Sequence, residues 1–384
     1  MSKWEMVRLG DVATYVNGFA FKPADWSNKG IPIIRIQNLT GTSDVVNYYD
    51  KKYSTKYEIN NGDVLISWSA SLGVYEWKKG KALLNQHIFK VVFDKLVLDK
   101  RFFVFVIAEK LREMSSLVHG STMKHITKKY FDRIEIQLPP LESQKKIATA
   151  LDSANALIEK RKEQIEKLDL LIKSQFIEMF GDPVTNPKGW SVNSLAQHLK
   201  VIGGYMFKST GYTMTGIPVL RIGNINTGTL TLNDLVYWTY TESLERYFIY
   251  PGDLVMSLTG TVGKDDYANV CVLPAFFDRY YLNQRNAKLN IFGDLSNMYL
   301  LYLLRNKEIK KKLTGISRGI RQANISNSDI LSLNVPIPPL SLQNQFAEFV
   351  EKVEAQKALL QKSLADMEQN YQSLLQKCFK GEIF

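Results

Sequence analysis

Three residues in the first half of the chain have the types and spacing of a metal-dependent nuclease: Asp63, Glu76 and Lys78. Two carboxylates in this pattern can hold a magnesium ion, and the lysine can help to activate water. The pattern is short, and a short motif gains meaning only from the elements that position it. Its role therefore depends on how the rest of the chain is organised.

Other catalytic motifs are incomplete. "TGTVGK" lacks the first glycine of a phosphate-binding loop, and Asp265 follows it where that loop needs Ser or Thr. Leu138 and Ile337 precede the two Pro-Pro pairs, where adenine methyltransferases have Asn or Asp. We expect no metal or cofactor on this chain, because no metal-ligand, disulfide or triad spacing links its histidines and cysteines, which are His87, His119, His125, His198, Cys271 and Cys378.

Composition sets further bounds. A length of 384 residues is enough for two domains, and a net charge of +11 favours an anionic partner such as nucleic acid. The start, "MSKWEMVRLG", has no apolar signal-peptide core, and the run "FFVFVIA" is too short to cross a bilayer. We therefore expect a cytoplasmic protein with no membrane partner.

The chain contains a tandem repeat with a period of about 190 residues. Five pairs of segments match in the same order, and the offset grows along the chain, which indicates small insertions in the second copy. The pairs are "NGFAFK" with "GGYMFK", "GIPIIRIQNLTG" with "GIPVLRIGNINTG", "NGDVLIS" with "PGDLVMS", "LNQ" with "LNQ", and "LPPLESQ" with "IPPLSLQ". In the second copy, Asp253, Asp266 and Ala268 replace the nuclease trio, so its lysine is absent and its first aspartate belongs to a shared turn.

Each copy divides into a globular head and a long helix. The heads, residues 1–140 and 183–340, contain short β-type runs such as "DVLISW" and "HIFKVVF" and a late helical piece, which predicts an α+β fold. The late pieces are "RFFVFVIAEKLREM" and "LSNMYLLYLLRNKEIKKKL". Residues 141–182 and 341–384 are expected to be the long helices, and each Pro-Pro pair ends a head and sets where its helix begins.

Apolar residues in the two long segments recur in steps of three and four, which is typical of a coiled-coil stripe. A helix of about 40 residues is about 60 Å long and cannot bury such a stripe alone. Because the ends of a compact domain are often close together, the second helix is expected to run back along the first. The predicted fold is two α+β heads joined by an antiparallel coiled coil with pseudo-two-fold symmetry. Its coil or partner-binding positions are Ile147, Leu151, Ile158, Arg161, Val353, Lys357 and Leu360.

Arg161 and Lys357 interrupt the two stripes. Their long stems could extend out of the seam into solvent, or their charges could contact acidic groups of a docked partner. Both interpretations remain open from the sequence.

The paired "LPPLESQ" and "IPPLSLQ" signatures, the tandem halves and the two long helices resemble the specificity subunits of type I restriction-modification systems. The resemblance covers nearly the whole chain. It implies a non-catalytic subunit in which each head is a target-recognition domain that reads half of a bipartite, asymmetric site in double-stranded DNA. It also implies that the helices set the spacing between half-sites and dock two methyltransferase subunits, with restriction (translocase-endonuclease) subunits in the full complex. S-adenosylmethionine, ATP and magnesium are then expected on the partner subunits.

Three alternatives remain. One is the recognition subunit of a related type II system with the same fold. Another is a magnesium nuclease that uses Asp63, Glu76 and Lys78. The third is a coiled-coil scaffold without a DNA role, which would not explain the net charge of +11.

The repeat also sorts the candidate DNA contacts. Residues shared by both heads cannot distinguish the half-sites, so they suit scaffold or phosphate contacts, whereas base reading is expected where the heads diverge. The divergent segments are "TSDVVNYYDKKYSTKY", "GKDDYANVCVLPAFFDRYY", "HGSTMKHITKK" and "GISRGIRQANIS", whose charges could also be simply solvated. The shared candidates are Lys22, Lys208, Arg35 and Arg221, and the others are Lys124, Arg279, Arg285, Arg318 and Arg321.

Overall fold

The computed structural model describes residues 4–117, 127–315 and 322–384, and the chain forms two compact units. The first unit comprises Met1–Lys162 and Ser363–Phe384, and the second comprises Glu163–Lys362. Each unit therefore combines one head with parts of both long helices. Within the described ranges, no helix is both long and apolar enough to span a membrane.

The first head contains two four-stranded sheets and one pair of strands. One sheet has the antiparallel order β2-β9-β6-β7, the other has the order β4-β3-β8-β5 with β3 and β8 parallel, and β1 pairs with β10. The elements in chain order are β1 (Glu5–Arg8), α1 (Leu9–Val12), β2 (Thr14–Asn17), η1 (Pro23–Asp25), β3 (Ile31–Ile34), α2 (Ile36–Thr40), β4 (Asn47–Tyr49), η2 (Thr55–Tyr57), β5 (Glu58–Ile59), β6 (Val64–Ser67), β7 (Gly73–Glu76), β8 (Ala82–Leu84), β9 (Ile88–Val92), α3 (Lys100–Leu117), α4 (Lys128–Phe131) and β10 (Glu135–Leu138).

The second head repeats this topology. Its sheets have the orders β12-β20-β16-β18 and β14-β13-β19-β15, β11 pairs with β22, and β17 pairs with β21. The elements in chain order are β11 (Ser191–Ser194), η3 (Leu195–Gln197), β12 (Leu199–Gly203), η4 (Ser209–Gly211), β13 (Ile217–Leu220), η5 (Ile222–Asn224), β14 (Val236–Trp238), η6 (Glu242–Tyr247), β15 (Phe248–Ile249), β16 (Leu254–Ser257), β17 (Thr259–Thr261), β18 (Val270–Val272), β19 (Tyr280–Leu282), β20 (Asn286–Ile291), α6 (Asn297–Arg305), α7 (Lys307–Thr314), β21 (Gln322–Asn324), α8 (Asn327–Leu331) and β22 (Asn334–Ile337).

One late helical piece differs from its prediction. The sequence predicts a single helix over "LSNMYLLYLLRNKEIKKKL", but the structure has two helices, α6 and α7, separated at Asn306. Asn306 has extended backbone angles, and its side chain accepts hydrogen bonds from the backbone N–H groups of Glu308 and Ile309. Asparagine at this position therefore caps a new helix, as its short polar side chain favours.

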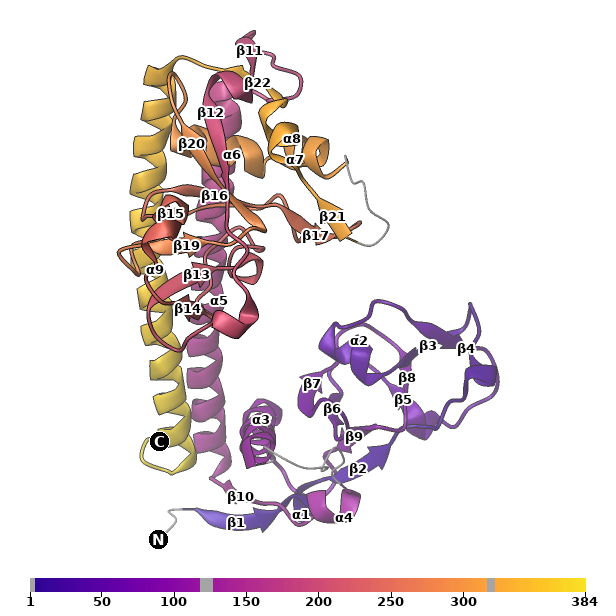
Figure 1. Ribbon diagram of the computed structural model, residues 1–384. Coiled ribbons are helices and arrows are strands. Elements are labelled where there is room, and N and C mark those ends of the chain that lie inside the picture. The colour runs from indigo at the N-terminus through magenta and orange to yellow at the C-terminus, as the bar shows by residue number, and fades with distance from the viewer. Residues whose placement is uncertain (1–3, 118–126, 316–321) are drawn as a thin grey trace. The chain divides into compact units, whose positions relative to one another are not determined.

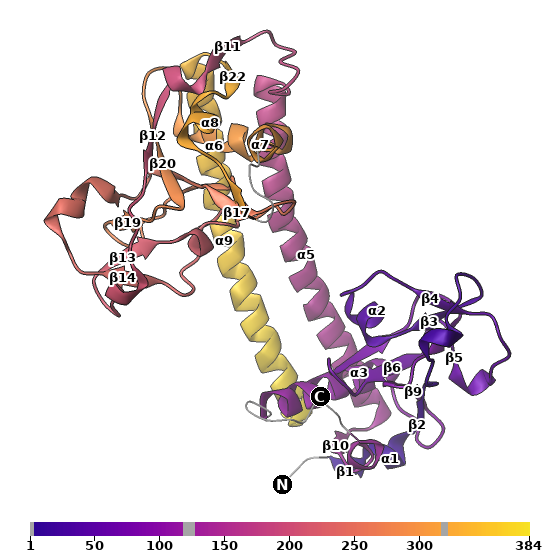
Figure 2. The same cartoon turned by 45° about the vertical axis from the view of Figure 1, so that its right-hand side comes forward.

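The two long helices are α5 (Leu141–Phe180) and α9 (Leu340–Phe379), which lie side by side in both views (Figures 1 and 2). In the first unit, Ile147 near the start of α5 shares a core with Leu375 and Cys378 near the end of α9. In the second unit, Ile172 near the end of α5 shares a core with Phe346 near the start of α9. The helices are therefore antiparallel, which confirms the prediction.

The repeated Pro-Pro-Leu-x-x-Gln motif joins each long helix to its head through a buried glutamine. Gln144 accepts a hydrogen bond from the backbone N–H of Asp99 at 2.8 Å and donates one to the carbonyl of Pro139 at 2.8 Å. Gln343 accepts from the backbone N–H of Ser296 at 2.8 Å and donates to Pro338 O at 2.8 Å. The motif recurs because each glutamine satisfies buried backbone groups where a head helix begins.

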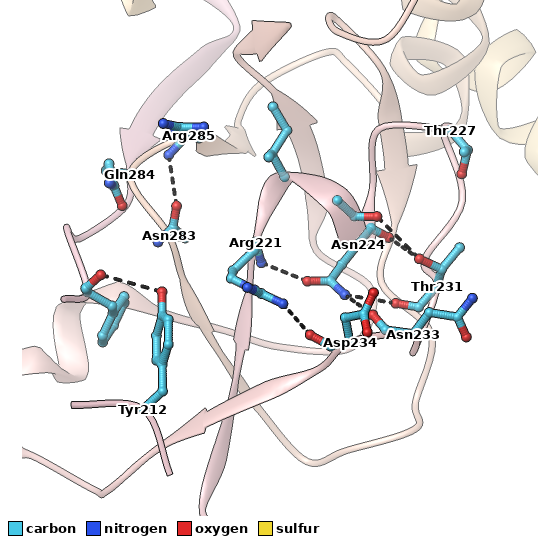
Figure 3. A pocket seen from close by; sticks show the side chains of 13 residues that line it. Tyr212, Arg221, Asn224, Thr227, Thr231, Asn233, Asp234, Asn283, Gln284 and Arg285 are labelled. Atoms are coloured by element: carbon cyan, nitrogen blue, oxygen red, sulfur yellow. Dashed lines mark hydrogen bonds between the residues drawn. The ribbon is translucent and has the colours of Figure 1, made fainter. Parts of the chain in front are cut away.

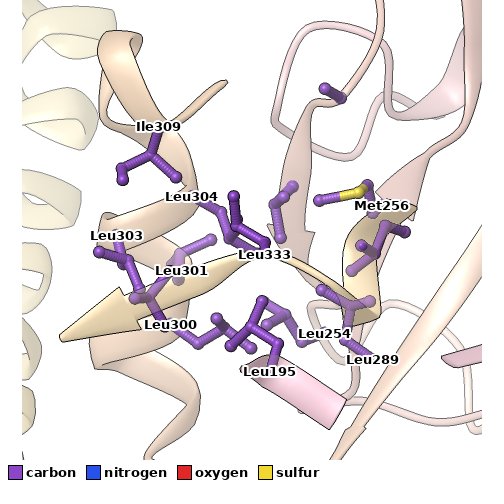
Figure 4. Packing of buried hydrophobic residues seen from close by; sticks show 14 of the residues in the cluster. Leu195, Leu254, Met256, Leu289, Leu300, Leu301, Leu303, Leu304, Ile309 and Leu333 are labelled. Carbon is purple, nitrogen blue, oxygen red and sulfur yellow. The ribbon is translucent and has the colours of Figure 1, made fainter. Parts of the chain in front are cut away.

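The core of the second unit continues from the head to the long helices. Leucines of α6 and Ile309 of α7 pack in one cluster with strand residues such as Leu254, Met256 and Leu289 (Figure 4). Tyr299 of α6 is fully buried, and its ring centroid lies 4.8 Å from that of Phe180 of α5. The head and the helix ends of this unit therefore form one hydrophobic core, which fixes the head against the coil.

Candidate nucleic-acid interface

Each head has an open cavity at the same place in the repeat. In the first head it has a volume of about 490 Å³ and is lined by Arg35, Ile36, Gln37, Thr40, Thr42, Ser69, Ala70, Ser71, Asn85 and His87. In the second head it has a volume of about 590 Å³ and is lined by Phe207, Tyr212, Arg221, Ile222, Gly223, Asn224, Thr227, Thr231, Asn233, Asp234, Asn283, Gln284 and Arg285 (Figure 3). We call these the head 1 cavity and the head 2 cavity. The repeat-related pairs that line both cavities include Arg35 with Arg221, Ile36 with Ile222, Asn85 with Asn283, and His87 with Arg285.

The shared arginines begin the short helices beside the cavities. Arg35 donates from Nη2 to the carbonyl of Val45 at 3.5 Å, and its guanidinium lies 5.1 Å from the ring centroid of Trp26. Arg221 makes the equivalent interactions with the carbonyl of Asp234 and with the ring of Tyr212. Both side chains thus help to hold the loop that follows them, in agreement with a scaffold role, while part of each guanidinium still lines a cavity.

The shared lysines stand before short 3₁₀ turns. Lys22 precedes η1 and Lys208 precedes η4, and both residues are exposed. The backbone N–H of Lys22 and the ammonium of Lys51 donate to Asp25, and these contacts hold the pKa of the Asp25 carboxyl below its usual range. The backbone of Lys22 is thus fixed while its charge faces solvent, which suits a phosphate contact.

Two of the divergent candidates lie on the surface of the second head. Arg279 is exposed and its guanidinium lies 5.1 Å from the ring centroid of Phe248, whereas Arg285 is exposed in the turn between β19 and β20. The structure brings Arg285 to the head 2 cavity with Arg221, but Arg279 does not line it. Lys124, Arg318 and Arg321 lie outside the described residues.

The divergent segments are only partly brought to these cavities. Thr42, at the start of the first segment, lines the head 1 cavity. Residues 265 and 268–270, from the second segment, instead line a different cavity of about 780 Å³ in the second unit. In that cavity the ammonium of Lys310 contacts both Asp265 and Asn269, so its charge is largely used within the chain.

The nuclease-like trio is built into ion pairs of the fold. Asp63 accepts a hydrogen bond from the backbone N–H of Asn60 at 2.8 Å and lies 3.0 Å from Lys90 Nζ. The second head repeats this arrangement, with Asp253 located 2.7 Å from Lys288 Nζ. Glu76 lies 3.5 Å from Arg101, and across the described ranges no group of three or more His, Cys, Asp or Glu is placed to hold a metal. The shared aspartate therefore closes a turn and pairs with a lysine in both heads.

The predicted coil residues divide into buried apolar positions and partly exposed ones. Ile147, Leu151, Ile158 and Val353 are buried, whereas Arg161 and Leu360 are partly exposed. Lys357 of α9 forms an ion pair with Asp169 of α5, so the charge that interrupts the stripe is met by an acid of the neighbouring helix. In the first unit, Lys162 and Glu368 also join the two helices, at 3.4 Å.

The sequence did not single out several residues that line the cavities. Asn224 illustrates the reason: it accepts from the backbone N–H of Arg221 at 3.0 Å and donates to the carbonyls of Thr231 and Asn233. These residues meet only when the loop folds back. For the part of each cavity that lies at the turn after β8 or β19, the repeated "LNQ" was the available signal, because it contains Asn85 and Asn283.

The chain is similar over nearly its whole length to known specificity subunits of type I restriction enzymes. The family model for the type I restriction modification DNA specificity domain matches residues 1–167 and again residues 187–369. The MjaVIII type I restriction enzyme specificity subunit of Methanocaldococcus jannaschii is 24% identical over 401 residues, which cover 99% of this chain and 93% of that protein. The EcoBI specificity subunit of Escherichia coli is 23% identical, with coverage of 99% and 86%.

A solved structure shares the fold. That structure comes from work on the structural basis of complex assembly and conformational transition of the type I R-M system. That chain is 18% identical to this one, has a TM-score of 0.62, and the match covers 99% of this chain and 98% of that one.

Proposed function

Because the chain belongs to the type I restriction-modification DNA specificity family, we propose that each head binds one half-site through the face that carries its cavity. The chain is a DNA-recognition subunit with two tandem target-recognition domains, and subunits of this kind are non-catalytic. The observation that carries the proposal is the repeated cavity, whose shared lining residues are an arginine, an isoleucine and an asparagine, while other lining residues differ, such as His87 in the first head and Arg285 in the second.

The chemistry of the cavity rims supports this proposal. Arginine, asparagine and glutamine side chains are the types that pair with base edges, and exposed lysines suit phosphate contacts. Lys22 and Lys208 are exposed at equivalent positions, and the chain carries a net charge of +11. Different linings on the same scaffold imply different half-sites, so the bipartite target is asymmetric.

We further propose that the chain works in a complex. Its relatives are named as specificity subunits of type I restriction enzymes. By analogy, two methyltransferase subunits dock on the α5–α9 pair, which also sets the gap between half-sites, and restriction subunits join this assembly. The partners carry the sites for S-adenosylmethionine, ATP and magnesium, and the complex acts on cytoplasmic DNA. A type II system with the same fold would use the same heads with different partners.

The test compares DNA methylation with and without the partner. The purified chain is incubated with DNA, magnesium, ATP and S-adenosylmethionine, and we expect neither cleavage nor methylation until the methyltransferase subunits are added. Genome-wide mapping of methylated adenines should then give one bipartite, asymmetric motif that disappears when the gene is deleted. Cleavage by the chain alone that Lys78→Ala abolishes, while the neighbouring Lys79→Ala does not, would contradict the proposal and favour the nuclease.

A further inference from the structure

Each head presents a β-turn at the rim of its cavity. In the first head the turn spans Asn85–Ile88 and is closed by a hydrogen bond from Ile88 N–H to the carbonyl of Asn85, at 3.2 Å. In the second head it spans Asn283–Asn286, with the equivalent bond at 2.9 Å. Two central residues of each turn therefore project from the same point of the repeated fold.

The surrounding backbone fixes both turns in the same way. The carbonyl of His87 accepts a hydrogen bond from Trp68 N–H at 3.3 Å, and the carbonyl of Arg285 accepts one from Leu258 N–H at 2.9 Å. The first residue of each turn donates its N–H to the strand that precedes the shared arginine, at 3.0 Å to Ile34 and at 3.3 Å to Leu220. Both heads thus place this turn at the cavity, which is lined by His87 in the first head and by Gln284 and Arg285 in the second.

The two central side chains of this turn differ between the heads at one position. The central residues are Gln86 and His87 in the first head, and Gln284 and Arg285 in the second. In the second head both are exposed, and neither side chain hydrogen-bonds to any other described residue; Figure 3 shows them together on one side of the cavity. In the first head, Gln86 Nε2 lies 3.2 Å from His87 Nε2, and the imidazole meets the ring of Trp68 edge-on.

We propose that the second central residue of this turn reads one base pair of each half-site, and that Arg285 selects guanine while His87 reads a different base. This inference rests on the proposed function. The guanidinium presents two parallel donors that match O6 and N7 of guanine in the major groove, and an imidazole ring lacks that fork. The glutamine that both heads share cannot distinguish the half-sites, so the discrimination falls to its neighbour.

The test uses Arg285→Ala in the assembled methyltransferase complex. Binding is measured on a set of duplexes that carry each of the four bases at every position of both half-sites. We expect the preference for guanine at one position of the head 2 half-site to fall by roughly 5- to 150-fold, the usual value of a good bidentate contact, with the head 1 half-site unchanged. Arg285→Lys keeps the charge without the fork, so it should lower the same preference by less than Arg285→Ala does, while keeping the salt dependence.

Lys208→Ala serves as the comparison for a phosphate contact. It should weaken binding to all duplexes alike and reduce the slope of log affinity against log salt by about one. Arg285→Ala with every base preference intact would overturn the inference, and so would uniform weakening like that of Lys208→Ala. In both cases the complex would still methylate a bipartite site, so the proposed function would stand; it fails only if the wild-type complex methylates no such site.

Discussion

Replacing Gln343 by alanine tests whether the buried glutamine fixes the second head to its long helix. The side chain is fully buried, accepts a hydrogen bond from Ser296 N–H at 2.8 Å, and donates to the carbonyls of Pro338 at 2.8 Å and Asp294 at 2.9 Å. A typical intramolecular hydrogen bond contributes about 1 kcal/mol, so Gln343→Ala should destabilise the second unit by about 3 kcal/mol. The unsatisfied N–H of Ser296 lies where α6 begins, so the loss should be largest there.

Hydrogen exchange followed by mass spectrometry measures this loss locally. A change of about 3 kcal/mol lowers amide protection by roughly 100-fold, since each 1.4 kcal/mol is a factor of ten. Protection should fall in peptides that contain Ser296 and α6. Gln144→Ala should act instead on α3 of the first unit, by about 2 kcal/mol, because that side chain makes two such bonds.

Gln345→Ala is the matched control. Gln345 lies on the same helix but is exposed, so its replacement should change stability by less than about 0.5 kcal/mol. The reasoning is refuted if Gln343→Ala costs no more than this control, or if it lowers protection equally in both units.

Two further perturbations address the thiols and the long helices. Burial raises the pKa of the Cys271 thiol to about 12 and that of Cys378 to about 11, so both stay protonated at pH 8. The contribution of the buried, protonated thiols to the free energy of unfolding should be fully present below the ordinary pKa of cysteine and should be lost as the pH rises toward these raised values. At pH 8, Ellman's reagent should label neither thiol until denaturant is added. Fast labelling of the native chain would contradict this. Inserting seven residues between Lys162 and Glu163 adds about 10 Å of helical rise, or about three base pairs, and keeps the stripe in phase. The gap in the methylated motif should lengthen by up to three bases with both half-sites unchanged. An active complex with an unchanged gap would show that α5 is not the spacer. A two-residue insertion rotates the apolar stripe by about 200° and should therefore weaken assembly of the complex.

The long helices could be predicted closely because their signal is local. A proline-proline stop and a regular stripe fix where a helix begins and which face is buried, and α5 starts directly after Pro140. The predicted coil positions do not include Phe176, Phe180 and Leu375, which are buried. At Phe180 the helix also packs against Tyr299 of the head. The spacing of apolar residues that predicts packing against one neighbouring helix does not predict this second contact.

The cavities could not be predicted because their walls are assembled from segments distant in sequence. Arg221 and Arg285 meet at the head 2 cavity only through the parallel pairing of β13 with β19. That pairing places Leu220 beside Leu282, and a parallel crossover leaves no short-range spacing to read. The repeat identifies the residues that the two cavities share, but it does not show that these residues line one cavity in each head.

The division of the coil between the two units has a consequence for synthesis on the ribosome. The first unit needs Leu375 and Cys378 to cover Ile147 and Leu151, yet the whole segment Glu163–Lys362 is made in between. At about 5–20 residues per second, the first head emerges about 10–40 s before its last core residues. The second unit is continuous in sequence and has no such wait. The domain made first is therefore the one whose folding finishes last, and a late stop codon would damage the N-terminal head before the C-terminal one.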